Sequence, residues 1–440
     1  MNPALPSKTR LIVSTDISSL KAGVGEPDDT QSLARLLLHA NEFDIEGLIA
    51  TSTKRGGEAH PEYIRSIVRE YGKVRANLAL HDPSYPTEHY LLNRVKAGLP
   101  DTDSIGKGRD SEGSNWIISV VDRADPRPVW IVIWGGSREL AQALWKVKNT
   151  RTADEFAAFQ SKIRVYAITD QDKTGRWIRA VHPNLFYITS RQAFRGMYRG
   201  GDPALVGREW VDKHVTHDHG PLGAAYPNYD GGDPWGRVRG VKEGDTPSFL
   251  YLIPNGLGDP ERPEWGSWGG RFAAEAADRA GSGKDAVCKN TRHYFDAKDT
   301  VNGETSERAT VYRWRPAYQA DFQARLDWCV RPPDKANHPP VAVLDGPGER
   351  VVRTGEKVVL SAEASHDPDG DRLSYCWFHY PEAGTYEGTI KINGANTPRA
   401  WFVAPEVDSR KTIHIILAVT DSGDPALTRY RRVVVTVERS

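Results

Sequence analysis

Acidic residues gather where the first apolar segment of the chain ends. That segment, LIVST, runs directly into Asp16, and Pro27-Asp28-Asp29 opens a helical pattern about a dozen positions later. Carboxylates held close together repel one another unless a cation lies between them, and an all-oxygen set suits Ca²⁺ or Mg²⁺ better than zinc. We therefore predict a calcium site here. The alternative is that Asp28 and Asp29 only cap the helix, since Pro27 favours a first turn.

A second acidic segment, Glu243-Gly244-Asp245-Thr246-Pro247, precedes the apolar run SFLYLI. Asp245 stands at an expected helix start, where an aspartate is a common N-cap. It could equally be a ligand that reaches the calcium from the far side. The pattern alone supports both interpretations.

These acids belong to a segment, from Arg10 to about Arg331, in which strand-like and helix-like patterns alternate. Apolar runs such as LIVST, FDIEGLIATS, PVWIVIW and IRVYAIT are strand-like, and helical patterns such as PDDTQSLARLLLHA lie between them. Such alternation is typical of an α/β fold with a mainly parallel, doubly wound sheet. The carboxyl ends of parallel strands form the ligand crevice of these sheets, and Asp16 falls at such an end.

The stretch from Gly200 to Arg271 is rich in Gly, Pro, Asp and aromatic residues. Long irregular stretches in compact domains are often functional, so we expect binding groups here. Trp265 and Trp268 either stack on sugar rings or fill the core. Three residues are candidates for a general acid: His219, Glu243 and Glu264.

The segment PPDKANHPPV reads as a linker, which divides the chain into residues 1–333 and 334–440. The strand patterns after it predict an all-β, immunoglobulin-like sandwich. Its segment HDPDGDRLSYCW resembles polycystic-kidney-disease-type or cadherin-like modules. Asp367, Asp369 and Asp371 are spaced like the start of a calcium loop, but the twelfth position is Phe378 instead of glutamate, so we predict a simple turn.

Composition excludes some partners. The chain has 58 basic residues (Lys and Arg) and 58 acidic residues (Asp and Glu), so no net charge attracts nucleic acid. No apolar run reaches the roughly 18 residues that a membrane span needs. The opening segment lacks the apolar core of a signal peptide, yet the sequence is compatible with a secreted or periplasmic protein whose signal peptide is absent from this chain. Thirteen tryptophans favour carbohydrate contact. A bridge between Cys288 and Cys329 and a homo-oligomer both remain open.

The quoted residues resemble the nucleoside hydrolases, which open with a strand, Thr-Asp and then an Asp-Asp pair. The sequence is closer still to a bacterial, cellulose-associated branch of nucleoside-hydrolase-like proteins, whose pattern includes PDD, GDTPSFLYLI, NGL and WGGR. This resemblance covers nearly the whole chain. It implies a nucleoside-hydrolase-like fold and a calcium-dependent attack on a glycosidic bond, with inversion at the anomeric carbon.

The resemblance also implies residue roles. Asp16 would be the catalytic base and a metal ligand, with Asp28, Asp29 and Asp245 as further ligands. The segment WGGSRE, near Arg138, resembles the family's carbonyl-donating turn at the metal. The predicted substrate-binding residues are Asp170, Gln171, Asp172, Trp177, His219, Glu264, Trp265 and Trp268.

Three departures from the family pattern bear on the substrate. Ser14 replaces the leading aspartate, the gap between Asp16 and Asp28 is longer, and Gly244 stands where a histidine assists the leaving base. Release of a nucleobase is therefore in question. The leading hypothesis is a calcium-dependent glycosidase acting on a pentofuranosyl, nucleoside-like or other small sugar substrate. The alternatives are a non-catalytic protein that binds cellulose or another glycan, and a sandwich that only orients the first domain.

Overall fold

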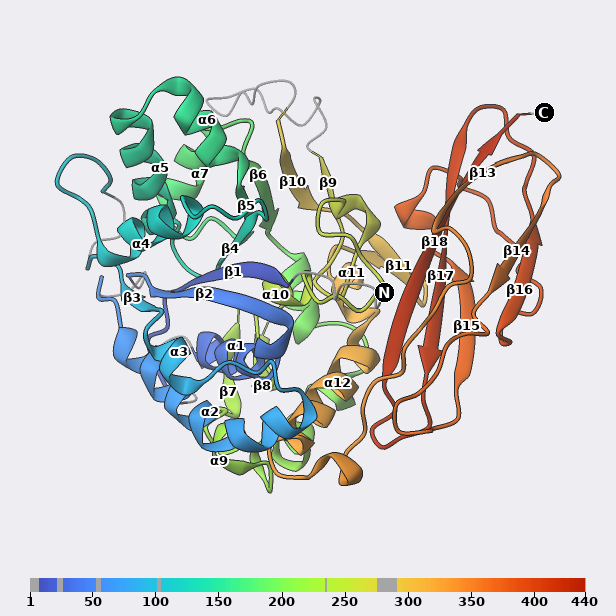
Figure 1. Cartoon of the computed structure of the whole chain (residues 1–440), viewed down its shortest axis with the longest axis horizontal. Coiled ribbons are helices and arrows are strands. Elements are labelled where there is room, and N and C mark those ends of the chain that lie inside the picture. Colours follow the sequence, from blue (N-terminus) through green and yellow to red (C-terminus); the bar gives the residue numbers. More distant parts are fainter. Residues whose placement is uncertain are drawn as a thin grey trace.

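The computed structural model describes residues 8–21, 27–52, 57–100, 104–233, 236–274 and 291–439. An α/β part occupies the left of Figure 1, and an all-β part, coloured orange to red, lies beside it. Both parts of the predicted fold class are confirmed.

The α/β part is organised around an eight-stranded sheet in the order β3-β2-β1-β4-β5-β6-β10-β9. The strands are β1 (Thr9–Thr15), β2 (Phe43–Ala50), β3 (Val95–Ala97), β4 (Val129–Ile133), β5 (Ile163–Ile168), β6 (Phe186–Ser190), β9 (Phe272–Ala274) and β10 (His293–Asp296). Neighbouring strands pair in parallel, except that β9 runs antiparallel to β10 at the edge. Parallel pairing brings the carboxyl ends of the central strands to one edge.

Helices cover both faces of this sheet, which is why β1 is apolar through most of its length. Leu11 and Val13 join one core, whereas Ile12 joins the other. The first core receives side chains from α1 (Pro27–Leu38), α2 (Pro61–His81) and α12 (Arg315–Asp327). The second receives them from α4 (Glu112–Val121), α5 (Arg138–Thr150), α6 (Ala153–Ser161) and α7 (Lys173–Val181).

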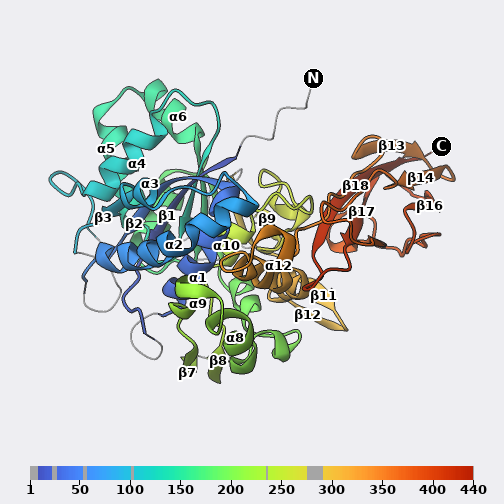
Figure 2. The same cartoon turned by 60° about the horizontal axis from the view of Figure 1, so that its bottom comes forward.

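The Gly- and Pro-rich stretch after residue 200 contains more regular structure than its composition suggests. It forms α8 (Arg208–Val211), α9 (Gly220–Ala224), α10 (Pro247–Leu250) and strands β7 (Tyr229–Asp233) and β8 (Gly236–Gly240). In Figure 2, α8, α9 and the β7–β8 pair gather below α1. Each of these elements is only four or five residues long, so loops still make up much of the stretch.

Shorter elements complete the α/β part. They are α3 (Glu88–Leu92), α11 (Ala309–Tyr312), β11 (Asp299–Val301) and β12 (Glu304–Ser306). Within the described residues no helix is long and apolar enough to cross a membrane. Cys329 is buried with its thiol against the Arg325 carbonyl oxygen at 3.6 Å, and Cys288 lies outside the described residues.

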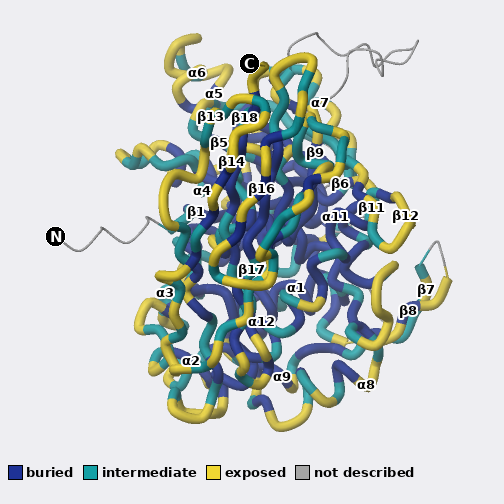
Figure 3. The backbone as a smooth tube through the Cα atoms, turned by 90° about the vertical axis from the view of Figure 1, so that its right-hand side faces the viewer, coloured by how far each residue is buried: buried dark blue, intermediate teal, exposed yellow. Residues whose placement is uncertain are grey.

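The all-β part has two sheets around one core. Strands β13 (Glu349–Arg353), β18 (Thr428–Glu438), β17 (Lys411–Thr420) and β15 (Ser374–His379) form one sheet, and β14 (Lys357–Ser361) pairs with β16 (Arg399–Val403) in the other. Trp377, Leu360 and Phe402 meet in the core between them. Figure 3 views this side of the molecule and shows buried strand segments in dark blue among exposed turns in yellow.

The two parts are joined by buried polar contacts as well as by the chain. The Arg432 guanidinium donates to the carbonyl oxygens of Leu257 at 2.8 Å and of Trp265 at 2.9 Å. Tyr380 donates its hydroxyl to Asp299 at 2.6 Å. These contacts fix the sandwich against the irregular segment that precedes β9 and against the first residue of β11.

We predict that the stability of the folded chain depends on pH, because His414 is buried at this interface. Burial, followed by the nearby Arg432 charge, lowers the pKa of His414 from 6.5 to about 3. The unfolded chain takes up this proton below pH 6.5 while the folded chain does not, so stability is complete above pH 6.5 and falls as the pH drops towards 3. The slope is at most about 1.4 kcal/mol per pH unit.

Urea unfolding at pH 7.5 and pH 5 measures this effect. The loss of stability at pH 5 should be smaller in His414→Gln, which keeps an acceptor for Arg432 but does not titrate. An equal loss in both proteins would contradict the assignment.

Candidate active site and metal centre

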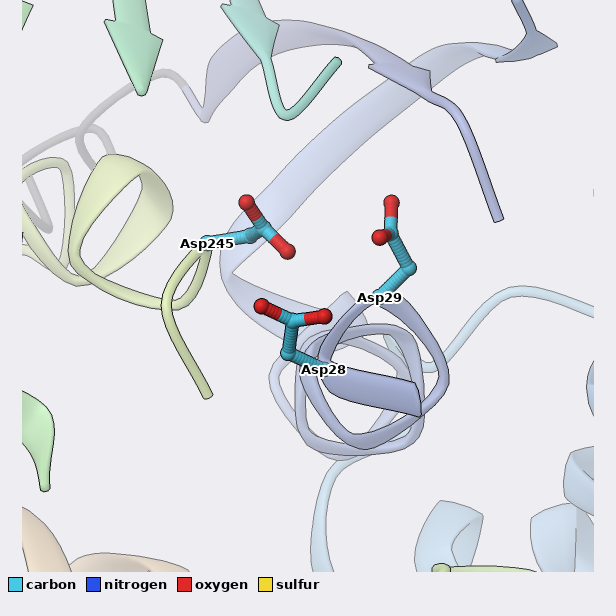
Figure 4. A group of neighbouring side chains, drawn as sticks. All are labelled: Asp28, Asp29 and Asp245. Atoms are coloured by element: carbon cyan, nitrogen blue, oxygen red, sulfur yellow. The ribbon is translucent and has the colours of Figure 1, made fainter. Parts of the chain in front are cut away.

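Three carboxylates meet at the amino end of α1. Asp28 and Asp29 lie in its first turn, Asp245 comes from the segment before α10, and one oxygen of each lies within 4.8 Å of the others. Figure 4 shows Asp28 and Asp245 facing one another across the gap between these segments, with Asp29 beside them. Asp29 and Asp245 are buried. The positive end of the helix dipole favours negative side chains here, and an all-oxygen set is suited to Ca²⁺.

Helix α1 also fixes the segment that carries Asp245. The Gln31 amide donates to the carbonyl oxygens of Pro227 at 2.6 Å and Gly240 at 2.9 Å, and its oxygen accepts from Lys242 N at 2.7 Å. One turn further along, Arg35 forms an ion pair with Glu243 at 2.6 Å. The ligand from the far side is thus held by the same helix that presents Asp28 and Asp29.

Glu243 is a structural residue. Its carboxylate is fully buried and accepts from Tyr226 Oη at 2.5 Å and Thr246 Oγ1 at 2.7 Å, in addition to the ion pair with Arg35. A carboxylate that neutralises a buried guanidinium is not available to protonate a leaving group. The prediction of Glu243 as a general acid was therefore wrong.

Asp16 lies near the three carboxylates but is not a member of their group. It follows β1, where the Thr15 hydroxyl donates to Asp29, and its side chain lies against Gly135. A Cβ placed on Gly135 would lie 2.5 Å from the Asp16 carboxyl carbon. Glycine is therefore required there by the close approach of Asp16, and the metal group contains three of the four aspartates that the sequence predicted.

The WGGSRE segment reaches the site through its glycines. Gly135 contacts Asp16, and a Cβ on Gly136 would overlap the Asp172 carboxylate. Arg138 was predicted to mark the metal-facing turn, but its buried guanidinium binds Glu139 at 2.8 Å and the Arg109 carbonyl oxygen at 2.9 Å. The glycines of the segment thus lie beside Asp16 and Asp172, whereas the Arg138 side chain points away from them because α5 begins at Arg138.

The residues after β5 divide into two groups. Gln171 donates its amide to the Trp134 carbonyl oxygen, and Asp172 caps α7 by accepting from Thr174 N at 2.8 Å. Both lie at the edge of the sheet next to Gly136 and Trp134. The turn begins at Thr169, whose φ of 61° is unusual for a β-branched residue and marks a constrained backbone.

Asp170 and Trp177, predicted as substrate contacts, serve α7 instead. Asp170 forms a two-point ion pair with Arg179 at 2.6 and 2.5 Å. Trp177 packs edge-on against His182, with ring centres 5.4 Å apart, and joins the core behind the sheet. The structure thus engages both side chains with α7 and the residues that follow it.

His219 and Glu264 are remote from the acidic group. His219 pairs with Asp327 at 3.3 Å, at the carboxyl end of α12. That end lies beside the last turn of α1, since Arg325 donates to the Leu38 carbonyl oxygen at 2.9 Å. Asp28 begins the same helix about 15 Å away. Glu264 is exposed next to the sandwich. The structure does not place either of them in the acidic group.

Trp265 and Trp268 belong to the contact with the sandwich. Trp268 has no exposed surface and packs edge-on against Tyr318 and Tyr430. Trp265 packs edge-on against His414 at 5.4 Å. Trp268 therefore fills the core, which is the alternative that the sequence left open, whereas Trp265 is half-buried.

Three aromatic residues near the site were not predicted. Phe194 packs 3.4 Å from where a Cβ on Gly244 would lie, and Asp28 lies 3.3 Å from the same point. Tyr198 is close enough to Asp28 for that charge to add to the effect of burial in raising the Tyr198 pKa. Trp134 donates to Ser248 Oγ at 2.8 Å, which donates to the Asp245 carbonyl oxygen at 2.6 Å. Only Trp134, at the end of a strand pattern, offered a signal in the sequence.

Comparison with known proteins assigns the family. The nucleoside hydrolase-like domain of the cellulose-binding Sde182 family matches residues 10–272, more than half of the chain. The chain belongs to this family. The C-terminal domain of the cellulose-binding protein Sde0182 matches residues 357–437 of the same Sde182-family chain. The resemblance inferred from PDD, GDTPSFLYLI and WGGR is confirmed.

A solved structure similar to this Sde182-family chain is a nucleoside hydrolase-related hypothetical protein from Saccharophagus degradans, associated with carbohydrate metabolism. It is 38% identical, the match covers 98% of this chain and 100% of that one, and the TM-score is 0.82. The PKD domain of the KIAA 1837 protein and the EC1-3 region of mouse clustered PcdhgC3 match 22% and 24% of the chain at 19% identity. These matches cover 86% and 35% of the two solved chains. Their TM-scores are 0.18 and 0.15, too low to support a statement about the fold. No curated protein matches significantly.

Proposed function

We propose that this Sde182-family protein is a calcium-dependent glycosidase that hydrolyses an N- or O-glycosidic bond of a pentofuranosyl or related small sugar. The observation that carries the proposal is the meeting of Asp28, Asp29 and Asp245 within 4.8 Å, beside Asp16 and at the carboxyl edge of the sheet. Three like charges this close favour a divalent cation that is ligated by oxygen.

The residues fit Ca²⁺, because all three donors are carboxylates and two of them are buried. When bound, Ca²⁺ would supply the charge that acidifies a coordinated water and holds sugar hydroxyl groups. Asp16 is the base in this proposal. It takes a proton from the water that attacks the anomeric carbon, the glycosidic bond breaks through an oxocarbenium-like transition state, and inversion is the expected outcome.

The choice of substrate follows from the three candidates for a general acid. His219, Glu243 and Glu264 are each committed elsewhere or remote, so we expect good leaving groups to be preferred because they depart without a proton. A p-nitrophenyl ribofuranoside is the first substrate to test, followed by nucleosides.

Metal analysis tests this proposal. Asp28→Ala should hold one calcium fewer per chain than the wild type and should lose hydrolysis of the ribofuranoside, because the remaining two carboxylates supply fewer ligand oxygens and less negative charge. Asp154→Asn, which changes an exposed aspartate on α6, should behave like the wild type. Equal calcium in wild type and Asp28→Ala would show that the acidic group is architectural.

The second candidate function is non-catalytic binding of cellulose or a similar glycan, which is favoured by the family description and by an exposed aromatic side chain. Trp401 on β16 is 36% exposed, beside Val403 at 52% and its cross-strand partner Val359 at 56%. The Lys357 ammonium lies over one face of the Trp401 ring, 4.2 Å from its centre, and the exposed apolar surface beside it suits the face of a sugar ring. This surface replaces Trp265 and Trp268 as the candidate for carbohydrate contact.

Cellulose pull-down tests the second candidate. Trp401→Ala should weaken retention about tenfold, the effect of losing roughly 1.4 kcal/mol at a central aromatic contact. Val351→Ala, on an exposed position of the other sheet, is the control. Unchanged retention of Trp401→Ala would exclude this strip as the binding surface.

A further inference from the structure

A second acidic group lies where the linker meets the sandwich. Asp367, Asp369 and Asp371 each bring an oxygen within 4.8 Å of the others. Two further segments reach the same place. His338 N donates to Asp369 Oδ2 at 2.7 Å, and Ser422 Oγ donates to Asp371 Oδ1 at 3.2 Å. The loop, the linker and the turn after β17 therefore converge on one point.

Buried oxygen atoms point to a ligand there. Asp421 and Asn337 are 5% and 8% exposed. Asn337 Nδ2 donates to Asp421 Oδ1 at 3.1 Å and to the Pro425 carbonyl oxygen at 2.8 Å, and these two acceptors fix the orientation of the amide. Asn337 Oδ1, Asp421 Oδ2 and Asp367 Oδ2 are buried and accept no hydrogen bond from the described part of the chain. A buried acceptor without a donor is costly.

Asp421 lies beside the three aspartates through its neighbours. It accepts from Asn337, whose neighbour His338 donates to Asp369, and it precedes Ser422, whose hydroxyl donates to Asp371. A simple turn does not account for this arrangement. The turn is present, since Asp367 Oδ1 accepts from Asp369 N at 2.9 Å and from Asp371 N at 3.1 Å, but it occupies only one Asp367 oxygen.

We propose that Asp367, Asp369, Asp371, Asp421 and the Asn337 amide oxygen form a calcium site at the junction of the two parts, separate from the site on α1. Four carboxylates and one amide oxygen are a hard, all-oxygen set, and flexible loops tolerate the irregular coordination of Ca²⁺. Glutamate is not needed at the twelfth position of the loop, because the linker and the turn after β17 supply the remaining ligands.

Calcium at this point fastens the linker. Trp328, which follows α12, donates its indole N–H to the Asn337 carbonyl oxygen at 2.8 Å, and its ring stacks on His338 with centres 5.1 Å apart. A cation held by Asn337 and the sandwich loops thus connects the sandwich to the end of α12. We infer that calcium sets the orientation of the sandwich relative to the α/β part.

Calorimetric titration of the full chain with CaCl₂ tests the site. The Asp28→Ala/Asp245→Ala variant removes the α1 site, so any calcium that remains bound reports the junction. We expect one Ca²⁺ per chain in this variant, at least tenfold weaker binding on adding Asp421→Asn or Asp369→Asn, and no change on adding Asp408→Asn, an exposed aspartate of the same sandwich.

No binding up to roughly 10 mM, above the range of weak calcium modules, would overturn the proposal. Unchanged binding in Asp369→Asn would do so as well, and this exposed position decides the matter if Asp421→Asn does not fold. Limited proteolysis gives an independent readout. Calcium should protect the linker around residues 332–340 in the Asp28→Ala/Asp245→Ala variant and should not protect it once Asp369→Asn is added.

Discussion

Asp16→Asn is expected to abolish hydrolysis of a ribofuranoside while calcium binding and folding are kept. Asparagine has nearly the same shape but does not accept a proton at neutral pH, so the general-base contribution, about 10²- to 10⁴-fold in kcat, is lost. Calcium should be retained because Asp16 lies outside the group formed by Asp28, Asp29 and Asp245. Steady-state kinetics and metal analysis of one preparation measure both quantities.

Gly135→Ala provides an independent route to the same result. The new Cβ would lie 2.5 Å from the Asp16 carboxyl carbon and would push it aside, so turnover should fall without loss of calcium. Gly207→Ala is the matched control, since a Cβ there meets only the Pro203 carbonyl oxygen at 3.6 Å. Full activity in Asp16→Asn would refute the assignment of Asp16 as the base. Loss of calcium in that variant would show instead that Asp16 is a metal ligand.

The sheet could be predicted because its signal is local. In β1, Leu11 and Val13 face one core and Ile12 faces the other. A continuous apolar run in the sequence therefore predicts a strand that is buried on both faces. The meeting of Asp28 with Asp245 could not be derived from spacing, since it depends on contacts of Gln31 and Arg35 with a distant segment. The pattern left Asp245 equally as an N-cap or as a far-side ligand, and the family resemblance favoured the ligand.

The failed site predictions have a common physical cause. His219, Trp265 and Trp268 lie in a stretch whose composition suggested a loop over a pocket. In the structure each of them packs against residues that are distant in the sequence. Trp268 is covered by Tyr430, which comes from the other part of the chain, and no pattern near Trp268 reveals that partner. Arg138 missed the site by three residues because a helix start moved its side chain away from the edge where Gly135 lies.

Arg35→Met is expected to have the largest effect on stability. Arg35 and Glu243 are both fully buried, and their ion pair at 2.6 Å ties α1 to the segment that carries Asp245. Removing the guanidinium leaves the Glu243 charge buried without its partner, which typically costs about 3–5 kcal/mol. Calcium affinity should fall as well, because Asp245 follows Glu243 by two residues. Urea unfolding and calcium titration measure the two losses.

Adding Glu243→Gln to Arg35→Met separates the charge from the shape of the side chain. Glutamine keeps oxygen and nitrogen atoms for the neighbouring Tyr226 and Thr246 but carries no charge, so the double variant should regain most of the stability lost in the single one. Arg237→Met breaks an exposed pair with Asp230 and should cost less than about 1 kcal/mol. A double variant no more stable than Arg35→Met would mean that the lost stability comes from the stacking of the Arg35 guanidinium on the Phe322 ring, 3.8 Å from the ring centre, and not from the unpaired Glu243 charge.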